Sequence, residues 1–278
     1  IARWIRRKPF VFEIRDLWPE LPKAMKVITN PLVLKALSGL ECASYHSAQR
    51  LIGLSPGIVD GICSRGIPED RVRMIPNGCD HDFFSQPTEP WRPKGVGRAD
   101  LMAVYTGAHG IANGLDSVIE VAQELKRRQR SDIKLVLVGD GKLKPELQRQ
   151  AKKAQLNNLI FLDPVPKPKL LRLLRAADLG MQILANVPAF YYGTSPNKFF
   201  DYLASGLPVL NNYPGWLADL ITEYDCGFIV PPDQTQAFAD NLEQAANGRS
   251  EIRQKGLRAK FLSDQFGREQ LAKQWVKW

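Results

Sequence analysis

Short apolar runs alternate with longer amphipathic stretches along most of the chain. In the second half, residues 101–107 (LMAVYTG) and 133–141 (IKLVLVGDG) are nearly continuous apolar runs, as in parallel strands buried on both faces. Between them, residues 114–130 keep their apolar side chains at helical spacing. This alternation predicts an α/β fold in which each helix crosses from one parallel strand to the next.

The same pattern occurs twice, once on each side of a stretch without periodicity. That stretch, SQPTEPWRPKGVG, is rich in Pro and Gly, so we place a domain boundary near residue 85. The other predicted strands cover residues 10–14, 50–55, 72–78, 159–162, 179–184, 208–212 and 227–232. The other predicted helices cover residues 31–50, 144–154, 167–176, 234–247 and 251–276, with one more after Ser195 and one beginning near Pro56. The prediction is two doubly wound domains, the first of them incomplete.

The composition is that of an ordinary globular protein and excludes few classes of protein. The apolar fraction of 44% and the charged fraction of 24% are those of a globular protein, and no apolar run is long enough to span a bilayer. The four cysteines and three histidines are scattered, which disfavours a zinc site and a disulfide framework and favours a reducing, cytoplasmic location. Because the first residue is Ile1 and not Met, we expect the sequence to lack its true N-terminus.

The net charge of +9 leaves several partners open. Basic clusters occur in RWIRRK (residues 3–8), KRRQR (126–130) and KPKLLRLLR (167–175), and the last two fit the solvated faces of amphipathic helices. The functional alternatives are an anionic membrane surface or a phosphate-bearing substrate. Nucleic acid is disfavoured because no interleaving of basic and aromatic residues is present.

Two loops after predicted strands contain glycines that allow a backbone to approach a phosphate. The loop TGAHGIANGL holds Gly107, Gly110 and Gly114, but it is neither a Walker loop nor a dinucleotide fingerprint. A tight strand-to-helix turn explains it equally well, although His109 at its tip has no evident packing role. In and after the second loop, VGDGK, Lys142 and Lys144 face either a diphosphate or solvent.

The segment GTSPNKFFDYLASGLPVL places a cation at the start of a helix. Ser195 is a suitable N-cap and Pro196 suits the first helical position, which leaves free backbone N–H groups near Asn197. Lys198 has the same sign as the helix dipole there, which costs about 0.3–1 kcal/mol unless an anion binds. Asp201, one turn later, is placed to accept a ribose hydroxyl. The alternative is a surface pair between Lys198 and Asp201.

Several motifs occur together in an order that resembles family 4 of the sugar-nucleotide glycosyltransferases. They are VRMIPNGCDHDFF, VYTGAHGIANGLDSVIEVAQEL, LVLVGDGKLKPEL, NLIFLDPVPKPKLLRLLRAADL and FFDYLASGLPVL, and the resemblance covers essentially the whole chain. It implies the GT-B fold of two Rossmann-like domains. Residues 1–84 would be a partial acceptor-side domain, residues 85–264 the domain that binds the nucleotide sugar, and residues 265–278 a helix that crosses back to the first domain.

The sequence departs from the family pattern at two places. The paired acids of the family fall on Gly193 and Asp201, and the pair of basic residues that usually binds the diphosphate falls on Ala108 and Asn113. Together with EIRDLWPE, these departures resemble a subgroup that builds bacterial capsule, O-antigen and colanic-acid-type polysaccharides, including transferases assigned to N-acetyl-L-fucosamine. Weak or lost activity is the alternative explanation of the departures.

The resemblance also implies roles for individual residues. Asp201 would bind the ribose, Asn197 and Lys198 the diphosphate, and Val165 the base. Asp16, or Arg15 beside it, would lie next to the transferred sugar. The predicted catalytic residues are Asp16 and His109, and the predicted substrate-binding residues are Asp201, Lys198, Asn197, Ser195, Gly107, Gly110, Lys142, Val165 and Arg15.

The resemblance implies a retaining glycosyltransferase that moves a sugar from a nucleoside-diphosphate donor, UDP-linked, to a lipid-diphosphate-linked saccharide. No metal and no cofactor are expected, because helix dipole and lysine would neutralise the leaving diphosphate. The basic N-terminal segment with Trp4 would attach the protein peripherally to the inner face of the cytoplasmic membrane, although a solvated start fits equally well. The rival functions are a sugar-nucleotide epimerase of the same fold and a non-catalytic nucleotide-sugar-binding protein.

Overall fold

A computed structural model describes residues 8–278, which form two compact units. Unit 1 contains the chain up to Gly78 together with Val187–Pro196 and Arg268–Trp278, and unit 2 contains Cys79–Asn186 and Asn197–Gly267. The division therefore falls at Gly78 and not near residue 85. The reason is that Cys79 already belongs to unit 2, where its N–H donates to the carbonyl of Phe266 at 2.9 Å.

Unit 1 is built on a parallel sheet with the order β1-β2-β3. These strands are Val11–Ile14, Arg50–Gly53 and Val72–Met74, and the core lies around Ile14, Leu51 and Ile58. The helices are α1 (Glu20–Ala24), α2 (Pro31–Ser47), α3 (Pro56–Cys63), α8 (Pro188–Tyr191) and α13 (Arg268–Lys277), with a 3-10 turn at Glu69–Arg71.

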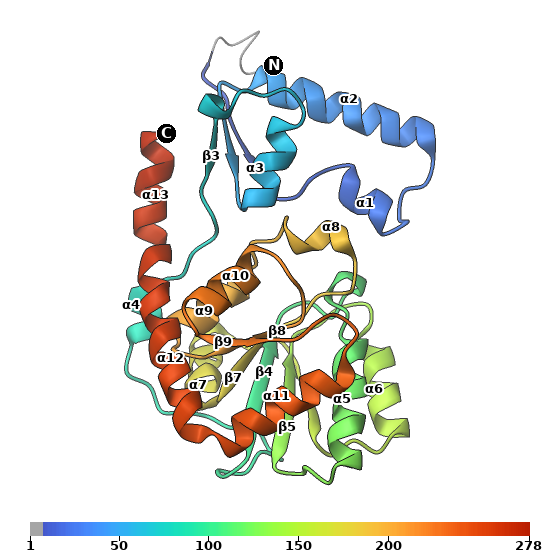
Figure 1. Ribbon diagram of the computed structural model, residues 1–278, viewed down its shortest axis with the longest axis vertical. Coiled ribbons are helices and arrows are strands. Elements are labelled where there is room, and N and C mark those ends of the chain that lie inside the picture. Colours follow the sequence, from blue (N-terminus) through green and yellow to red (C-terminus); the bar gives the residue numbers. More distant parts are fainter. Residues whose placement is uncertain (1–7) are drawn as a thin grey trace. The chain divides into compact units, whose positions relative to one another are not determined.

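Unit 2 contains a six-stranded parallel sheet with the order β6-β5-β4-β7-β8-β9 (Figure 1). The strands are β4 (Leu101–Thr106), β5 (Ile133–Val138), β6 (Leu159–Leu162), β7 (Leu179–Gln182), β8 (Val209–Asn211) and β9 (Gly227–Ile229). This is the order of a doubly wound dinucleotide-binding sheet, whose direction of winding reverses between β4 and β7. Ligands of such sheets bind beyond the carboxyl ends of the strands at that reversal.

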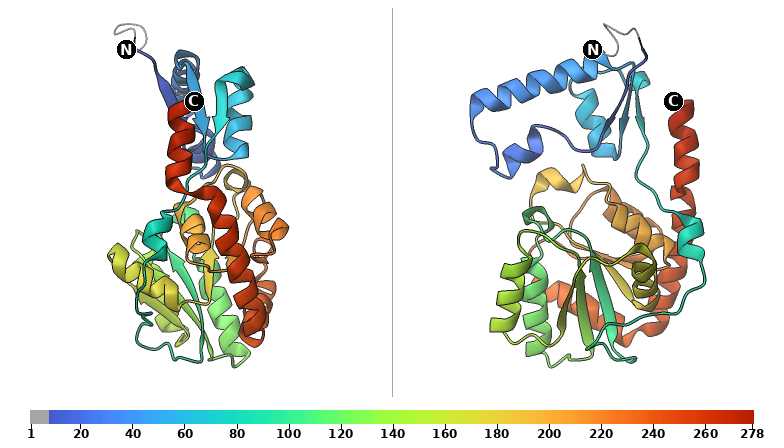
Figure 2. Two further views of the ribbon diagram at one scale, coloured as in Figure 1. Left: turned by 90° about the vertical axis from the view of Figure 1, so that its left-hand side faces the viewer. Right: turned by 180° about the vertical axis from the view of Figure 1, so that it is seen from behind.

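Helices cover both faces of the unit 2 sheet (Figures 1 and 2). They are α4 (His81–Ser85), α5 (Asp116–Arg127), α6 (Lys144–Lys153), α7 (Lys167–Ala176), α9 (Asn197–Ala204), α10 (Trp216–Glu223), α11 (Thr235–Asn247) and α12 (Arg249–Ser263), with 3-10 turns at Ile111–Asn113 and Asp264–Phe266. One side of the core joins β4 and β5 to α5, α6 and α11.

The C-terminal region differs from its prediction. A single helix over residues 251–276 was expected, but α12 ends at Ser263 and α13 begins at Arg268. The break occurs where the side chain of Phe266 is buried and contacts Phe200 at a ring-centroid distance of 4.9 Å. A straight helix could not turn this phenylalanine into the core and continue along the surface. Among residues 8–278, no helix combines the length and hydropathy needed to cross a bilayer.

Candidate functional site

The loops after β4 and β5 come so close together at the carboxyl edge of the sheet that only glycine fits. Gly107 and Gly139 have φ angles of +151° and +146°. A Cβ on Gly139 would lie 1.9 Å from the carbonyl oxygen of Gly107. Gly139 is thus needed for backbone packing, whatever else it does.

The loops after β4 and β7 meet directly at the reversal of the sheet. The N–H of Ala185 donates to the carbonyl of Ala112 at 3.0 Å. A Cβ on Gly114, whose φ is +56°, would lie 2.6 Å from the Cα of Ala185. The loops after β4 and β7 are therefore in direct contact, and α9 begins beside them.

Lys198, in the first turn of α9, reaches the end of β4. Its Nζ lies 4.0 Å from the centroid of the Tyr105 ring. A Cβ on Gly107 would be 3.0 Å from both the Cε and the Nζ of Lys198. The ammonium is therefore placed over an aromatic ring and beside a glycine, at the edge where a Rossmann-like sheet binds its ligand.

No described carboxylate pairs with the ammonium of Lys198. The surface pair with Asp201, the alternative explanation from the sequence, does not form. The side chain of Lys198 is only half-buried, yet desolvation around its ammonium lowers the pKa of Lys198 to about 7. A cation held without a counter-ion is stabilised when an anion binds to it.

Tyr202 fixes α9 against β4. Its hydroxyl accepts a hydrogen bond of 2.8 Å from the N–H of Thr106, and its ring covers Gly180, where a Cβ would come within 2.4 Å of the ring. Lys198 and Tyr202 are one turn apart on α9, so they share a face of the helix. Tyr105 and Tyr202 were not identified from the sequence, where tyrosines next to apolar runs are indistinguishable from core residues.

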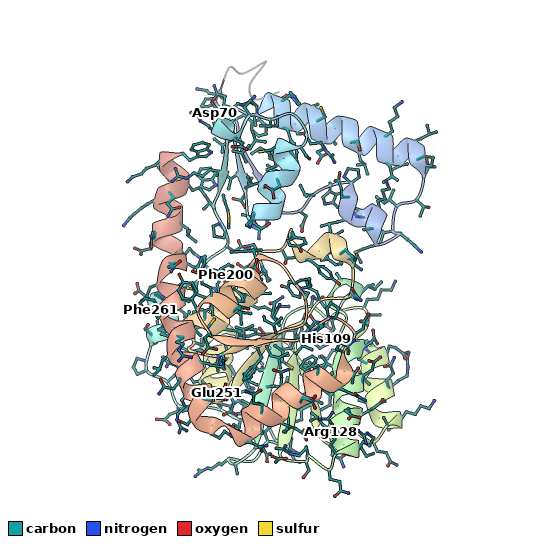
Figure 3. The ribbon with its side chains drawn as sticks, in the orientation of Figure 1. Asp70, His109, Arg128, Phe200, Glu251 and Phe261 are labelled. Atoms are coloured by element: carbon teal, nitrogen blue, oxygen red, sulfur yellow. The ribbon has the colours of Figure 1, made fainter. Side chains whose placement is uncertain are left out.

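His109 is buried, although the sequence showed no evident packing role for it and the resemblance implied a catalytic one. Its side chain, labelled in Figure 3, has 0% exposed surface, and its ring centroid lies 6.1 Å from that of Tyr105 and 6.3 Å from that of Phe161. Neither imidazole nitrogen has a hydrogen-bond partner. Burial, reinforced by the nearby charge of Lys144, lowers the pKa of His109, so the ring is neutral at pH 7. The structure therefore gives this side chain a packing role.

Lys142 and Lys144 have different environments although they are close in sequence. Lys142 is exposed in the loop after β5, and no described residue bonds its ammonium. Lys144 is buried and donates to the carbonyls of Gly139 and Leu162 at 2.8 and 3.1 Å. It also forms a 2.6 Å ion pair with Asp163. Only Lys142 is therefore available to a ligand.

The remaining predicted residues of unit 2 lie at or near the same edge. Asn197 is exposed at the first position of α9, and Asp201 is half-buried one turn later. Val165 is half-buried in the loop between β6 and α7, and Gly110 caps the 3-10 turn after β4. All four follow strands of one sheet.

Ser195 has another role than the one predicted. Helix α9 begins at Asn197, so Pro196 and not Ser195 precedes its first residue. Ser195 belongs to unit 1, where its hydroxyl accepts a 3.1 Å hydrogen bond from the N–H of Asn77. The side-chain amide of Asn77 donates in turn to the carbonyl of Ser195. This serine joins two segments of unit 1.

Unit 1 contains a cavity of about 370 Å³ beside the end of β1. Asp16 and Arg15, both candidates for the acceptor side, line it, and aromatic and apolar side chains form most of its wall. The side chain of Asp16 is exposed overall, yet desolvation by the surrounding protein raises the pKa of its carboxyl. Arg15 forms a 3.4 Å ion pair with Glu13. The complete lining is Phe12, Glu13, Ile14, Arg15, Asp16, Trp18, Leu37, Leu40, Glu41, Ser44 and Tyr45.

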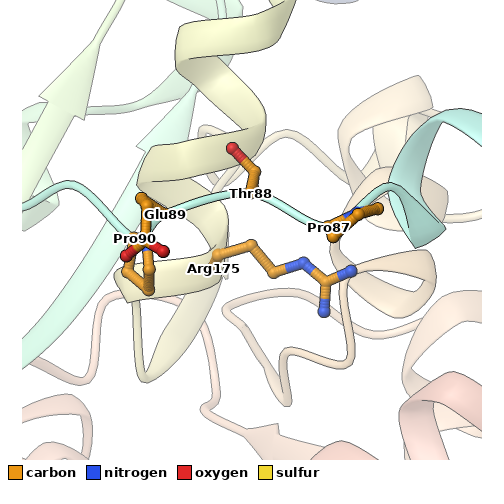
Figure 4. A pocket seen from close by; sticks show the side chains of 5 residues that line it. All are labelled: Pro87, Thr88, Glu89, Pro90 and Arg175. Carbon is orange, nitrogen blue, oxygen red and sulfur yellow. The ribbon is translucent and has the colours of Figure 1, made fainter.

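A second cavity, of about 600 Å³, lies between the end of α7 and the segment 87–90 (Figure 4). Arg175 lines it and donates to the carbonyl of Phe84 at 2.8 Å. Because helices run antiparallel to the strands in such a sheet, the end of α7 lies at the amino edge of the strands. Its volume would admit a ligand, but its position is opposite to the expected donor site. Within the described part of the chain, no three His, Cys, Asp or Glu residues cluster as metal ligands do.

Comparison with known proteins decides the family. The model of the family "Glycosyl transferases group 1" matches residues 92–260, which is most of unit 2 and more than half of the chain. The chain belongs to this family. Its fold is GT-B, and the predicted glycosyltransferase family is thereby confirmed.

Curated relatives of this group 1 glycosyltransferase are named as glycosyltransferases, and one of them is named for the O-antigen chain. D-rhamnosyltransferase WbpZ of Pseudomonas aeruginosa is 26% identical over 221 residues, which cover 76% of this chain and 54% of the relative. O-antigen chain mannosyltransferase C of Escherichia coli is 24% identical over 232 residues, which cover 81% of this chain and 56% of the relative. The chain thus spans about half the length of these relatives.

Solved structures share the fold of this group 1 glycosyltransferase. HepE of Anabaena, in complex with UDP-glucose, matches with a TM-score of 0.74 at 17% identity, over 100% of this chain and 74% of that chain. WaaG, a glycosyltransferase involved in lipopolysaccharide biosynthesis, matches with a TM-score of 0.72 at 18% identity, over 91% of this chain and 70% of that chain.

Proposed function

We propose that the chain transfers a sugar, with retention, from a nucleoside-diphosphate donor to a lipid-linked or polysaccharide acceptor in bacterial surface-polysaccharide synthesis. The observation that carries this proposal is the ammonium of Lys198, placed at the reversal of the unit 2 sheet without a described carboxylate partner. A diphosphate supplies the missing negative charge at the edge where Rossmann-like sheets bind nucleotides.

Lys198 would act on the leaving group. As the bond between the anomeric carbon and the diphosphate breaks, its electron pair stays on the diphosphate oxygen. The acceptor hydroxyl oxygen forms the new bond to that carbon, and its proton passes to the leaving diphosphate. The ammonium and the positive end of the α9 dipole stabilise the charge that develops. This proposal needs no metal, and addition of a chelator is expected to leave activity unchanged.

Other residues at the same edge complete the proposed donor site. Asp201 accepts the ribose hydroxyls, Asn197 and Lys142 contribute to diphosphate binding, and the backbone near Val165 contacts the base. Gly107 and Gly110 let the loop after β4 approach the phosphates. The UDP and UDP-glucose in HepE structures support a uridine nucleotide as donor.

On the acceptor side, we place Asp16 and Arg15 next to the transferred sugar. The relative named as an O-antigen chain mannosyltransferase supports a polysaccharide acceptor. Attachment of that acceptor to a lipid diphosphate is what the family resemblance implies. N-acetyl-L-fucosamine is the donor sugar that the subgroup resemblance favours. A peripheral site on the inner face of the cytoplasmic membrane suits such an acceptor. The basic segment proposed to dock there lies, except for Lys8, outside the described residues.

Calorimetric titration of the protein with UDP, GDP and dTDP tests the donor site. One of them, UDP by our proposal, is expected to bind, and Lys198→Ala is expected to weaken its binding by at least about tenfold through loss of a charge-assisted contact. Lys152→Ala is the matched control, because Lys152 is an exposed lysine of α6 in the same unit. Unchanged affinity in Lys198→Ala would remove the phosphate assignment.

A second assay separates the rival functions. Release of free nucleoside diphosphate from a nucleotide sugar is measured with and without a lipid-linked saccharide extracted from bacterial membranes. Acceptor-dependent release supports transfer. Interconversion of the sugar without release would indicate an epimerase, and binding without either reaction would indicate a non-catalytic nucleotide-sugar-binding protein.

A further inference from the structure

We propose that Tyr105 is a positioning residue for the donor diphosphate, because its ring face holds the ammonium of Lys198 beside the opening that Gly107 leaves. This inference rests on the proposed function and names a residue that the donor would not touch. The relevant contacts all lie within unit 2.

The Tyr105 ring is a fixed support. Its side chain has 0% exposed surface, and its hydroxyl donates to the carbonyl of Ala108 at 2.9 Å. The hydrogen bond therefore fixes the hydroxyl end of the ring, and burial restricts the rest. Its face lies 4.0 Å from the Nζ of Lys198, well within the range of a cation–π contact.

The position of α9 brings Lys198 to this ring. Tyr202, one turn after Lys198, is bonded to Thr106, the residue that follows Tyr105 in β4. Two consecutive residues of the strand thus contact two residues on one face of the helix. The backbone of Lys198 is therefore held at a fixed position relative to the Tyr105 ring, which the ammonium of Lys198 contacts.

Gly107 leaves the space for the end of the lysine. A Cβ there would be 3.0 Å from the Cε and Nζ of Lys198 and 3.2 Å from the Tyr105 hydroxyl. The φ angle of +151° also strains any side chain at this position. A methyl group on Gly107 would thus push the ammonium away from its present place.

An aromatic ring can hold the ammonium of Lys198 without neutralising its charge, which a carboxylate at this position could not do. It attracts the ammonium through its quadrupole but leaves the full positive charge available to another anion. A carboxylate partner would neutralise that charge and compete with the phosphates of the donor. The tyrosine thus orients the lysine and keeps it free for the diphosphate.

The test compares binding of a nucleoside diphosphate, whichever of UDP, GDP and dTDP binds the wild type, with binding of its nucleoside. Tyr105→Leu is expected to weaken diphosphate binding about tenfold and to leave nucleoside binding unchanged, since only the phosphates meet Lys198. Tyr105→Phe keeps the ring face and is expected to lose less than about threefold. Phe238→Leu, which removes a buried ring of the same core cluster, controls for loosening of the core.

A double-mutant cycle gives the decisive result. If Tyr105 acts through Lys198, then Tyr105→Leu weakens binding no further in a Lys198→Ala background. Gly107→Ala supplies a second variant should Tyr105→Leu fail to fold, and it is expected to weaken diphosphate binding but not nucleoside binding.

Three outcomes would count against the proposals, and they are distinguishable. If Lys198→Ala weakens binding but Tyr105→Leu and Gly107→Ala do not, the positioning role is wrong and the donor site stands. If Tyr105→Leu weakens the binding of the nucleoside and of the nucleoside diphosphate equally, the role of Tyr105 is structural only. If no nucleoside diphosphate binds the wild type, the proposed function itself fails.

Discussion

The hydroxyl of Tyr202 accepts a 2.8 Å hydrogen bond from the N–H of Thr106, which joins α9 to the end of β4. Tyr202→Phe removes this acceptor and leaves the N–H without its partner. The free energy of unfolding is expected to fall by about 1–3 kcal/mol, measured by urea denaturation. Tyr224→Phe is the control, because its hydroxyl accepts only from the exposed amide of Gln265. Equal stability of the two variants would show that the Thr106 contact contributes nothing.

Donor affinity is expected to depend on pH through Lys198. Burial lowers the pKa of Lys198 to about 7, so the free protein loses this positive charge as the pH rises through that value. A bound diphosphate favours the charged form and raises the pKa again. Donor affinity is therefore highest below about pH 7. Above that value it decreases, and the decrease approaches about tenfold for each pH unit.

Titration with a nucleotide sugar between pH 6 and 9 measures this dependence, because its diphosphate carries no group that titrates in the range. Lys198→Arg keeps its charge throughout and should bind with nearly constant affinity. A wild-type affinity that does not change between pH 6 and 9 would contradict the assignment.

The two lysines after β5 are expected to differ in what they affect. Lys144→Gln loses a buried ammonium that bonds two carbonyls and Asp163, so the free energy of unfolding should fall by about 1.5–3 kcal/mol. Lys142→Gln should leave stability unchanged and weaken only diphosphate binding. Urea denaturation and calorimetric titration of both variants check this, and the reverse assignment of effects would show that their roles are exchanged.

The ribose role of Asp201 can be tested with a ligand that lacks one hydroxyl. Wild-type protein is expected to bind a 2′-deoxynucleoside diphosphate at least about fivefold more weakly than the ribonucleotide. Asp201→Ala should bind both with the same, weaker affinity. Asp219→Ala, at an exposed acid of α10, is the control and should discriminate as the wild type does. Discrimination that persists in Asp201→Ala would assign the ribose to another residue.

His109→Leu tests whether the imidazole takes part in catalysis. Since neither ring nitrogen has a partner and the side chain has 0% exposed surface, the change should alter the free energy of unfolding by less than about 1 kcal/mol. We expect kcat to stay within a few-fold of wild type. A hundredfold loss of kcat with unchanged donor affinity would instead return His109 to the catalytic role that the sequence suggested.

Much of the fold was predictable because apolar runs and glycine stops coincide with the strands. The prediction for β6 matches the structure in both bounds, and α5 and α6 differ only by a few terminal residues. The short helices α1, α4 and α8 were missed, because four or five residues are too few for a helical period to be visible. The eight-residue α10 was also missed, because no Ser-Pro pair marks its start as one does for α3 and α9. The order of the six strands could not be obtained either, since it depends on long-range pairing.

The candidate site was predictable in part for a similar reason. Lys198 was identified because a cation at a helix start violates a local rule, and such violations are visible in one sequence. The burial of Lys144 and His109 follows from neighbours on other strands, such as Asp163 and Phe161, so no local pattern marks it. The place of Ser195 beside Asn77 depends on a contact between distant segments.

The membership of Val187–Pro196 in unit 1 has a practical consequence for dissecting the protein. The described chain passes between the units after Gly78, Asn186, Pro196 and Gly267. Neither terminal truncation nor a single cleavage can therefore isolate a complete unit. A fragment covering residues 79–267 would still carry the ten residues Val187–Pro196, which belong to unit 1, directly before Asn197 at the start of α9. Replacing these ten residues with a short flexible linker is the modification that would yield a self-contained nucleotide-binding module.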